Sequence, residues 1–568
     1  MRFEKSLTIA LALMVVLLSA SCGGGGGKVS PVLGGVNSPQ EENSEPDDEV
    51  ASPESPFASL FELSGTYVTE SPRTEIDPEY VLVKTGDTPE EFKKVASKFR
   101  YEVIAKNGNW ITLRVPDGNI ERALTELNKE YTVFSAEPLY KYVMPKPLGM
   151  AGKKRLTSFL PADPLYADRN IGPDPQFRVD ANGNPLYGTF WGQRVYMAPM
   201  GFEGAWDIAI LPTVRDKAVT VAVIGAGISP NQFDIDTARI HSASGTIAAD
   251  GTFTQGSYNW EVDANQNPYD EWGGRMTGLF LSQFNNVNGF NFTTGDPPVT
   301  WEWLSGMAPL TPFAQVMIIK TGELQGSNWV FTSAHLANSI NHAVTNGANI
   351  IVIATWAVGP VPLQVQDAVD NARNNNVLVI APAGESTLND NGTPNDITDD
   401  FWNPPVDVST VTPASANGVI SVGGTGFEQV DFGIDPPPPA GYANRLIPNI
   451  GNPWWRLDEF SNTGVDIAAV GWGLSWEDQV FFGYFNSFGP SFTNIGTGYA
   501  AGYVAGAAAI MYQALTNANG GTPPPDVDQV IEDLLYSSAN TEVFDTTGVQ
   551  SGFLQAGLAC ALANNGGW

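Results

Sequence analysis

The sequence predicts a protein of the α/β class, in which a mainly parallel sheet carries helices on both faces and a small α+β module precedes it. Two observations predict this fold. Six short apolar runs without polar alternation lie between residues 218 and 469, which is typical of strands buried on both faces. Helical patterns separate these runs, as the crossover connections between parallel strands require.

The N-terminus has the layout of an export signal. Arg2 and Lys5 precede an apolar run over residues 7–18, and small residues follow it. The pattern also resembles a bacterial lipoprotein signal, in which the cysteine after the small residues, here Cys22, is lipidated. We therefore expect residues 1–21 to be a signal peptide and the protein to be exported. The lipid would anchor it in the bacterial cell envelope, and plain secretion to the extracellular space is the alternative.

Residues 22–76 form the next segment, which is rich in glycine, proline and acidic residues. Such a composition buries too little apolar surface to offset the conformational entropy lost on folding. The segment is therefore predicted to be a flexible tether.

Residues 77–145 have the pattern of a small α+β module. The strand-like runs and the two helical runs alternate in the order β-α-β-β-α-β, the split βαβ arrangement of ferredoxin-like folds. The predicted strands cover residues 79–85, 101–106, 110–115 and 131–138, and the predicted helices cover 88–99 and 119–130. Modules of this kind more often bind, inhibit or assist folding than catalyse.

The charge of the chain is strongly negative and unevenly distributed. The formal net charge is −32, which argues against a nucleic-acid partner because binding to phosphate backbones depends on basic surfaces. Residues 79–155 nevertheless hold 14 Lys and Arg against 10 Asp and Glu, a net of +4. The module and the acidic remainder could attract each other, and chance segregation is the alternative.

Residues 146–195 are loop-like and are predicted to be a linker, after which residues 196–568 form the α/β domain. In sheets of this class, ligand sites gather at the carboxyl ends of the strands. The predicted strands cover residues 218–224, 313–319, 349–354, 377–381, 419–422 and 465–469, with helices over 332–347 and 363–375.

Four segments of the α/β domain resemble the motifs of the subtilisin-like serine proteases. VAVIGAGI at 221–228 is similar to the family's V-A-V-I-D-[ST]-G-I, and NPYDEWGGRMTG at 267–278 to its H-G-T-H-V-A-G. VLVIAPAGES at 377–386 is similar to V-V-A-A-A-G-N-E, and IGTGYAAGYVAG at 495–506 to G-T-S-M-A-x-P-H-V-A-G. The module resembles the family's propeptide. The resemblance covers about residues 79–568 and implies a subtilisin-like fold.

The resemblance also implies that the family's catalytic positions hold other residues. Gly225 stands at the aspartate and Trp272 at the general-base histidine, while Gly384 stands at the oxyanion-hole asparagine and Gly498 at the nucleophilic serine. We therefore expect a pseudoprotease that binds a protein or peptide, with its own propeptide-like module as one partner, or that serves as a structural envelope component. The alternative is an active serine endopeptidase with displaced catalytic groups.

Two tryptophans are expected in the cleft. Trp272 replaces the histidine, and Trp356 lies in ATWAV, which resembles the family's substrate-aligning strand. Two large indoles in one groove predict either a sealed core, which we favour, or an aromatic binding surface.

The resemblance implies one cofactor, calcium. Asp234 and Asn285 match calcium-binding positions of the family, and calcium prefers oxygen ligands. The signal has low specificity in a chain with 61 carboxylate side chains, and no other cofactor is predicted.

The glycine-rich stretch at 495–506 admits two other interpretations. A dinucleotide-binding loop requires a strand directly before it and an acidic residue about 20 positions later; the sequence pattern predicts no strand at this place, and the acidic residue is missing. A membrane helix would have basic residues at its ends, and these too are missing. The stretch is therefore predicted to begin a helix buried in the core.

Overall fold

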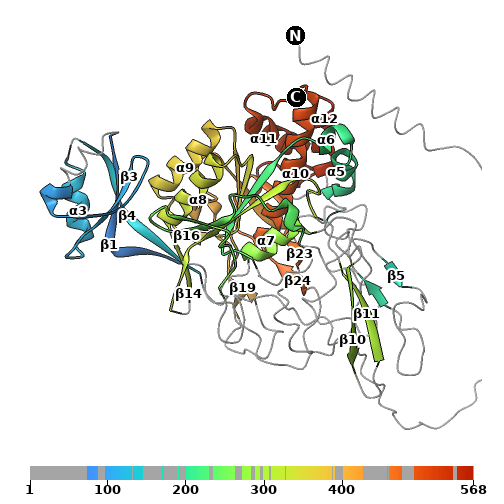
Figure 1. Ribbon diagram of the computed structural model, residues 1–568, viewed down its shortest axis with the longest axis horizontal. Coiled ribbons are helices and arrows are strands. Elements are labelled where there is room, and N and C mark those ends of the chain that lie inside the picture. The colour runs from blue at the N-terminus through green and yellow to red at the C-terminus, as the bar shows by residue number, and fades with distance from the viewer. Residues whose placement is uncertain are drawn as a thin grey trace, which may run out of the picture. The chain divides into compact units, whose positions relative to one another are not determined.

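The computed structural model places part of the chain, and all structural statements below concern these residues (Figure 1). They belong to the compact unit Ser55–Trp568. The described ranges are 73–86, 96–130, 132–144, 169–171, 188–190, 197, 200–228, 235–261, 272–282, 288–294, 299–305, 309–326, 328–386, 388–389, 401–425, 457, 460–475, 491–541 and 546–566.

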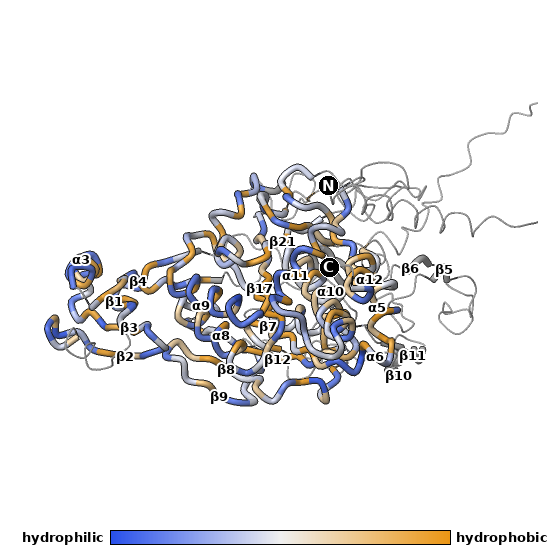
Figure 2. The backbone as a smooth tube through the Cα atoms, turned by 90° about the horizontal axis from the view of Figure 1, so that it is seen from above, coloured by the Kyte–Doolittle hydropathy of each residue, from blue (hydrophilic) through white to orange (hydrophobic). Residues whose placement is uncertain are grey.

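An eight-stranded sheet forms the centre of the α/β domain, in the order β22-β21-β17-β15-β7-β12-β8-β9. Neighbouring strands are parallel except β8 and β9. All six predicted strands are present, and Figure 2 shows hydrophobic residues along β7, β17 and β21. The bounds are β7 Thr220–Gly225, β8 Gly245–Ile247, β9 Phe253–Gln255, β12 Gln315–Thr321, β15 Ile350–Ile353, β17 Leu378–Pro382, β21 Val419–Thr425 and β22 Ile467–Val470.

Helices cover both faces of this sheet, as the α/β class requires. Helices α8 and α9 lie side by side on one face, and α10 packs with α5 and α12 on the other (Figure 1). The bounds are α5 Phe202–Ala209, α6 Pro212–Arg215, α7 Trp272–Leu281, α8 Ser333–Thr345, α9 Leu363–Asn374, α10 Thr497–Ala518, α11 Val527–Ser538 and α12 Ala556–Asn564.

Helix α10 is the predicted buried helix, and all its residues from 497 to 516 are buried. Its glycines permit a very close approach of neighbouring side chains. A Cβ atom added at Gly506 would lie 2.7 Å from Cβ of Leu310, and one added at Gly502 would lie 2.9 Å from Cδ1 of Leu279. The glycines are therefore explained by packing. Within the described ranges, no helix combines the length and apolar character needed to cross a membrane.

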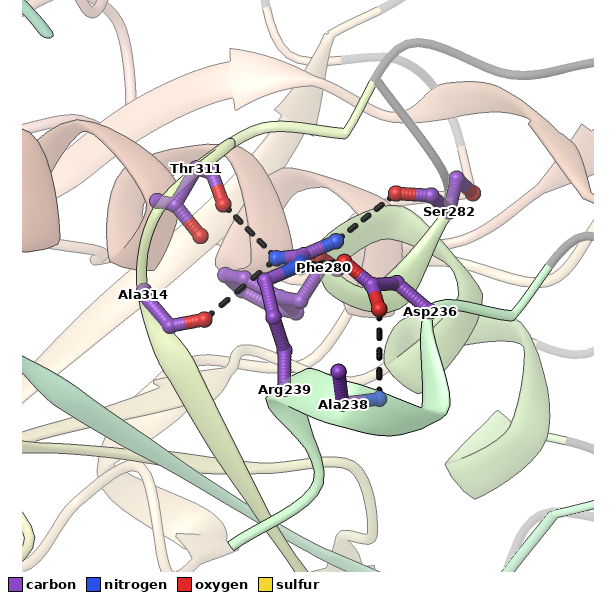
Figure 3. A network of polar contacts seen from close by, with 7 residues as sticks. All are labelled: Asp236, Ala238, Arg239, Phe280, Ser282, Thr311 and Ala314. Atoms are coloured by element: carbon purple, nitrogen blue, oxygen red, sulfur yellow. Dashed lines mark hydrogen bonds and ion pairs between the residues drawn. The ribbon is translucent and has the colours of Figure 1, made fainter. Parts of the chain in front are cut away.

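The C-terminal end of α7 is held by the guanidinium of Arg239, a residue of the short helix η2 (Thr237–Arg239) whose side chain is 11% exposed. Its Nη1 donates to the carbonyl oxygens of Phe280 at 2.7 Å and Thr311 at 2.9 Å, and its Nη2 donates to that of Ser282 at 2.7 Å (Figure 3). Asp236 accepts from Nε at 3.0 Å. The last carbonyls of a helix lack intrahelical donors and attract cations, so Arg239 satisfies them and fixes α7 in place.

The module has the predicted ferredoxin-like arrangement, with antiparallel strands in the order β2-β3-β1-β4. Residues 96–99 are helical, and the first part of the predicted 88–99 helix lies outside the described residues. Strand β1 begins four residues inside the stretch predicted as tether, because those residues pair with β4. The bounds are β1 Arg73–Thr85, β2 Glu102–Asn107, β3 Trp110–Arg114, α3 Ile120–Leu127 and β4 Val133–Met144.

One face of the module packs against the α/β domain. Leu82, Trp110 and Leu139 form a cluster with Ala334 of α8. Polar contacts add specificity to this apolar contact, because Nζ of Lys84 and Nε1 of Trp110 both lie 2.6 Å from the same carboxylate oxygen of Asp367 in α9.

Glu137 of the module caps helix α9. Its carboxylate accepts the backbone N–H groups of Leu363 at 2.8 Å and Gln364 at 3.0 Å. These N–H groups have no partner within the helix, and α9 has no side-chain cap of its own. The module therefore supplies a structural element that the α/β domain lacks.

The sheet of the module continues into the α/β domain, in the order β13-β14-β4-β1-β16-β20. The domain strands involved are β13 Glu323–Gln325, β14 Asn328–Thr332, β16 Ala357–Val358 and β20 Val411–Thr412. Nothing in the sequence pattern predicts this shared sheet.

Four further strand pairs were not predicted, and one of them lies inside the stretch 146–195 that was predicted to be a linker. This pair joins β5 Arg169–Ile171 and β6 Gly188–Phe190. The others join β10 Asn288–Thr294 with β11 Val299–Ser305, β18 Leu388–Asn389 with β19 Phe401–Trp402, and β23 Trp472–Ser475 with β24 Ser491–Ile495.

Candidate functional site

The described positions of the four motifs lie at the carboxyl edge of the central sheet. Gly225 is the last residue of β7, Gly384 follows β17, and Gly498 is the second residue of α10. Trp272 is the first residue of α7, and its side chain lies outside the described atoms. The N–H of Gly384 donates to Oγ1 of Thr497 at 3.1 Å, which brings the third and fourth motifs together.

Gly225 lies against the first turn of α7. A Cβ atom added at Gly225 would lie 2.8 Å from Cα of Gly273 and 3.1 Å from Cβ of Ala354. Conversely, one added at Gly273 would lie 2.8 Å from the backbone nitrogen of Ala226. Separations below 3.0 Å force atoms to move, so this pair of backbones leaves no room for a side chain at position 225.

Trp356 fills the space beside Gly384. The indole is 5% exposed, and a Cβ atom added at Gly384 would lie 2.6 Å from its Cε3 and 2.8 Å from its Cδ2. Gly384 also has φ of +82°, a left-handed conformation that L-residues with side chains rarely adopt. Both the neighbouring ring and the backbone conformation therefore require glycine here.

Glu385 places a carboxylate at the N-terminus of α10. Its Oε1 accepts the N–H of Thr497 at 2.6 Å and the Oγ1–H of the same residue at 2.7 Å. The helix has no side-chain cap of its own at Gly496, so Glu385 partly satisfies the free N–H groups of its first turn. Burial raises the pKa of Glu385, while hydrogen bonds from Thr497, Trp356 and Gly498 act in the opposite direction.

Replacing Glu385 by glutamine is expected to change how stability depends on pH. The folded pKa lies above the ordinary value of 4.5. The contribution of Glu385 to the free energy of unfolding is therefore fully present below pH 4.5 and is lost as the pH rises through the folded pKa. Glutamine does not titrate. The free energy of unfolding of Glu385→Gln minus that of the wild type should therefore increase with pH, as urea unfolding between pH 4 and pH 8 would measure.

Glu121→Gln, a change at an exposed position of α3, is the control for loss of a surface charge. A difference between Glu385→Gln and wild type that falls as the pH rises would contradict the placement of the carboxylate in a desolvated site.

Asn462 holds the loop that carries Gly384. Its Nδ2 donates to the carbonyl of Ala383 at 2.9 Å, and its backbone N–H donates to the carbonyl of Gly384 at 3.2 Å. The preceding Ser461 is fully buried, and its Oγ accepts the N–H of Gly424 at 3.0 Å. Both residues therefore support the backbone around the site.

The three histidines of the chain have local structural contacts. His335 is buried, and Nδ1 lies 2.9 Å from Oγ1 of Thr332, the N-cap of α8. Burial lowers the pKa of His335 to about 4, so the ring is neutral near pH 7. Nε2 of His342 lies 3.0 Å from the carbonyl of Ala243, whose N–H donates to Nδ1 of His241 at 3.2 Å.

Other predicted site residues lie outside the described part of the chain. These are the lipidation position Cys22 and the calcium positions Asp234 and Asn285. In the described ranges, no group of three or more His, Cys, Asp or Glu side chains is placed to hold a metal ion. Calcium binding therefore stays a prediction from the sequence.

Sequence reasoning singled out Trp356, which lies beside Gly384, and missed Glu385 and Arg239. The signal for Glu385 lies in the motif itself, because A-G-E at 383–385 aligns with A-G-N of V-V-A-A-A-G-N-E and puts Glu385, rather than Gly384, opposite the asparagine. A carboxylate at the end of a buried parallel strand lies at the edge where helix N-termini also meet. Arg239 stands in DTARI, a context without comparable signal.

Comparison with known protein families identifies the class of this chain. A family model described as the subtilase family matches residues 216–555, which is more than half of the chain. The protein therefore belongs to the subtilase family, and its fold is the subtilisin-like α/β fold. A comparison with curated protein sequences gives no match.

Solved structures with a similar fold include fervidolysin from Fervidobacterium pennivorans, described as a keratinolytic enzyme related to subtilisin. It is 16% identical, with a TM-score of 0.51 over 88% of this chain and 64% of that chain. The epidermin leader peptide processing serine protease from Staphylococcus aureus is 13% identical, with a TM-score of 0.46 over 87% of this chain and 99% of that chain. At such identities, the likeness to fervidolysin concerns the fold alone.

Proposed function

We propose that this subtilase-fold protein has no peptidase activity and acts by binding a protein or peptide, or as a structural component of the cell envelope. We further propose that it is exported and anchored through a lipid on Cys22. The observation that carries the first proposal is the close packing at two of the four motif positions. Backbone atoms of α7 fill the space beside Gly225, and the indole of Trp356 fills the space beside Gly384.

The position assigned to the nucleophile supports the same proposal. Gly498 has no side-chain atom that could attack a carbonyl carbon. The hydroxyl of the adjacent Thr497 is fully buried and already bonded to Glu385 and Gly384, so it is a poor substitute. The three histidines contact neighbouring structural residues, so none of them is a candidate for the missing general base.

The expected energetic consequence is large. In serine proteases, a site without its triad retains about 10³- to 10⁴-fold acceleration over water, supplied by the oxyanion hole and by substrate binding. Loss of an oxyanion-hole donor lowers the rate by about a further 10²- to 10³-fold. A chain that lacks both the triad and the oxyanion-hole donor should retain little acceleration over water.

An active serine endopeptidase with displaced catalytic groups is the second candidate, and membership of the subtilase family favours it. The two candidates differ in their reaction with a serine-directed fluorophosphonate probe and in the mass of the native protein. We expect no labelling, and we expect a mass that includes the module. An acyl group on Cys22 would be detected in the same mass spectrum.

A known active subtilase is the positive control for the probe. Labelling that disappears on denaturation, together with a mature chain that begins after about residue 150, would establish the endopeptidase instead.

A further inference from the structure

Two strands of the module enter the α/β domain together. Strand β4 pairs antiparallel with β14, with Lys141 opposite Thr332. Strand β1 pairs parallel with β16, with Arg73 opposite Val358. The chain segments on both sides of the module therefore lie between β14 and β16, with β1 next to β16 and β4 next to β14.

The downstream strand is anchored by an aromatic side chain. Tyr142 of β4 is fully buried and belongs to the core of the α/β domain. Its ring centroid lies 4.9 Å from that of Phe331 in β14. Buried aromatic side chains supply much of the binding energy of interfaces, so Tyr142 secures the C-terminal end of the module.

The upstream strand has anchors of its own. Oγ1 of Thr74 donates to the carbonyl of Val358 at 2.6 Å. The next residue must be small, because a Cβ atom added at Gly359 would lie 2.6 Å from that Oγ1. Asp77, whose side chain is 5% exposed, forms an ion pair with Lys141 at 2.7 Å and ties the two strands together.

We propose that residues 73–76 are a locking strand, which holds the module in the α/β domain independently of the chain after Met144. Breaking the backbone between the module and the domain removes the covalent link and leaves the pairing with β16 in place. Two attachments on one rigid module act together, because release requires both to open at once. The inference holds whether or not the domain has peptidase activity.

The test uses the full-length chain with a recognition sequence for a site-specific protease inserted after Gly152. After complete cleavage, time-resolved size-exclusion chromatography at nanomolar concentration follows the release of the N-terminal fragment. We expect the cleaved wild type to elute as one complex. Thr74→Val, which removes the hydroxyl bond, should release the fragment about fivefold faster, since one hydrogen bond contributes roughly 1 kcal/mol. Gly359→Val, which displaces Thr74, should release it at least about tenfold faster.

Thr125→Val is the matched control, because it removes a threonine-to-carbonyl bond on the exposed face of α3. It should leave the release rate unchanged. Circular dichroism of the uncut variants establishes that each is folded, and the mild Thr74→Val keeps the test valid if Gly359→Val does not fold. The proposal would be overturned if the cleaved wild type released the fragment as fast as Thr74→Val and Gly359→Val do. It would also be overturned if the wild type and all three variants retained the fragment equally.

Discussion

Replacing Arg239 by methionine is expected to lower the free energy of unfolding by about 3 to 5 kcal/mol, because three carbonyl oxygens lose their donor and each buried acceptor left unsatisfied costs about 1 to 3 kcal/mol. Methionine fills part of the volume and donates no hydrogen bond. The carbonyl oxygens of Phe280 and Ser282 at the end of α7, and that of Thr311 in the segment before β12, would lose their charged donor. Urea unfolding followed by tryptophan fluorescence measures the change.

Arg215→Met is the matched control. Arg215 also forms an ion pair, with Asp216 at 3.1 Å, but both side chains are largely exposed. Exposed pairs contribute little, so this change should stay within about 0.5 kcal/mol of the wild type. Arg239→Lys keeps the charge but lacks the planar guanidinium group, so its loss of unfolding free energy should lie between those of Arg239→Met and Arg215→Met. A loss at Arg239→Met no larger than that at Arg215→Met would contradict the bonding described for the guanidinium.

Gly384→Asn is expected to lower the free energy of unfolding by about 2 to 4 kcal/mol and to add no peptidase activity. The new Cβ atom would press on the indole of Trp356, and overpacking of this kind costs about 1 to 3 kcal/mol. The left-handed backbone adds about 1 kcal/mol for a non-glycine residue. Urea unfolding and a fluorogenic peptide assay measure the two outcomes.

Gly347→Asn separates the two causes of this loss. Gly347 has the same φ of +82°, but an added Cβ atom would meet nothing within 4 Å. It should therefore show the backbone cost alone, about 1 kcal/mol. In a Trp356→Ala background, Gly384→Asn should cost little more than Gly347→Asn. Equal losses at positions 347 and 384 in the native background would show that Trp356 does not fill the space beside Gly384.

The fold could be predicted from the sequence because its main elements leave strong local patterns. Parallel strands buried on both faces are continuous apolar runs, which is why β7, β15 and β17 could be located. The alternation of strands and amphipathic helices likewise identified the order of the module. Helix α10 could be recognised because it is apolar on all sides and the segments around it follow a globular pattern.

The shared sheet and the details of the site could not be predicted, because they depend on pairs of residues far apart in the chain. Arg73 pairs with Val358 through backbone groups, which have no residue signature. Glu385 and Thr497 are 112 residues apart, and nothing local indicates that the carboxylate points at α10. Trp356 was expected in the cleft, but its contact with Gly384 depends on the turn that follows β17.

The late position of α10 has a consequence for synthesis of the chain. Strand β7 ends at residue 225, and the helix that covers its sheet begins at residue 497, so 271 residues lie between them. Ribosomes add roughly 5 to 20 residues per second, so the apolar strands stay uncovered for about 15 to 55 seconds before α10 has been synthesised. The core therefore closes only after α10 has been synthesised, and a chain that stops before α10 should aggregate.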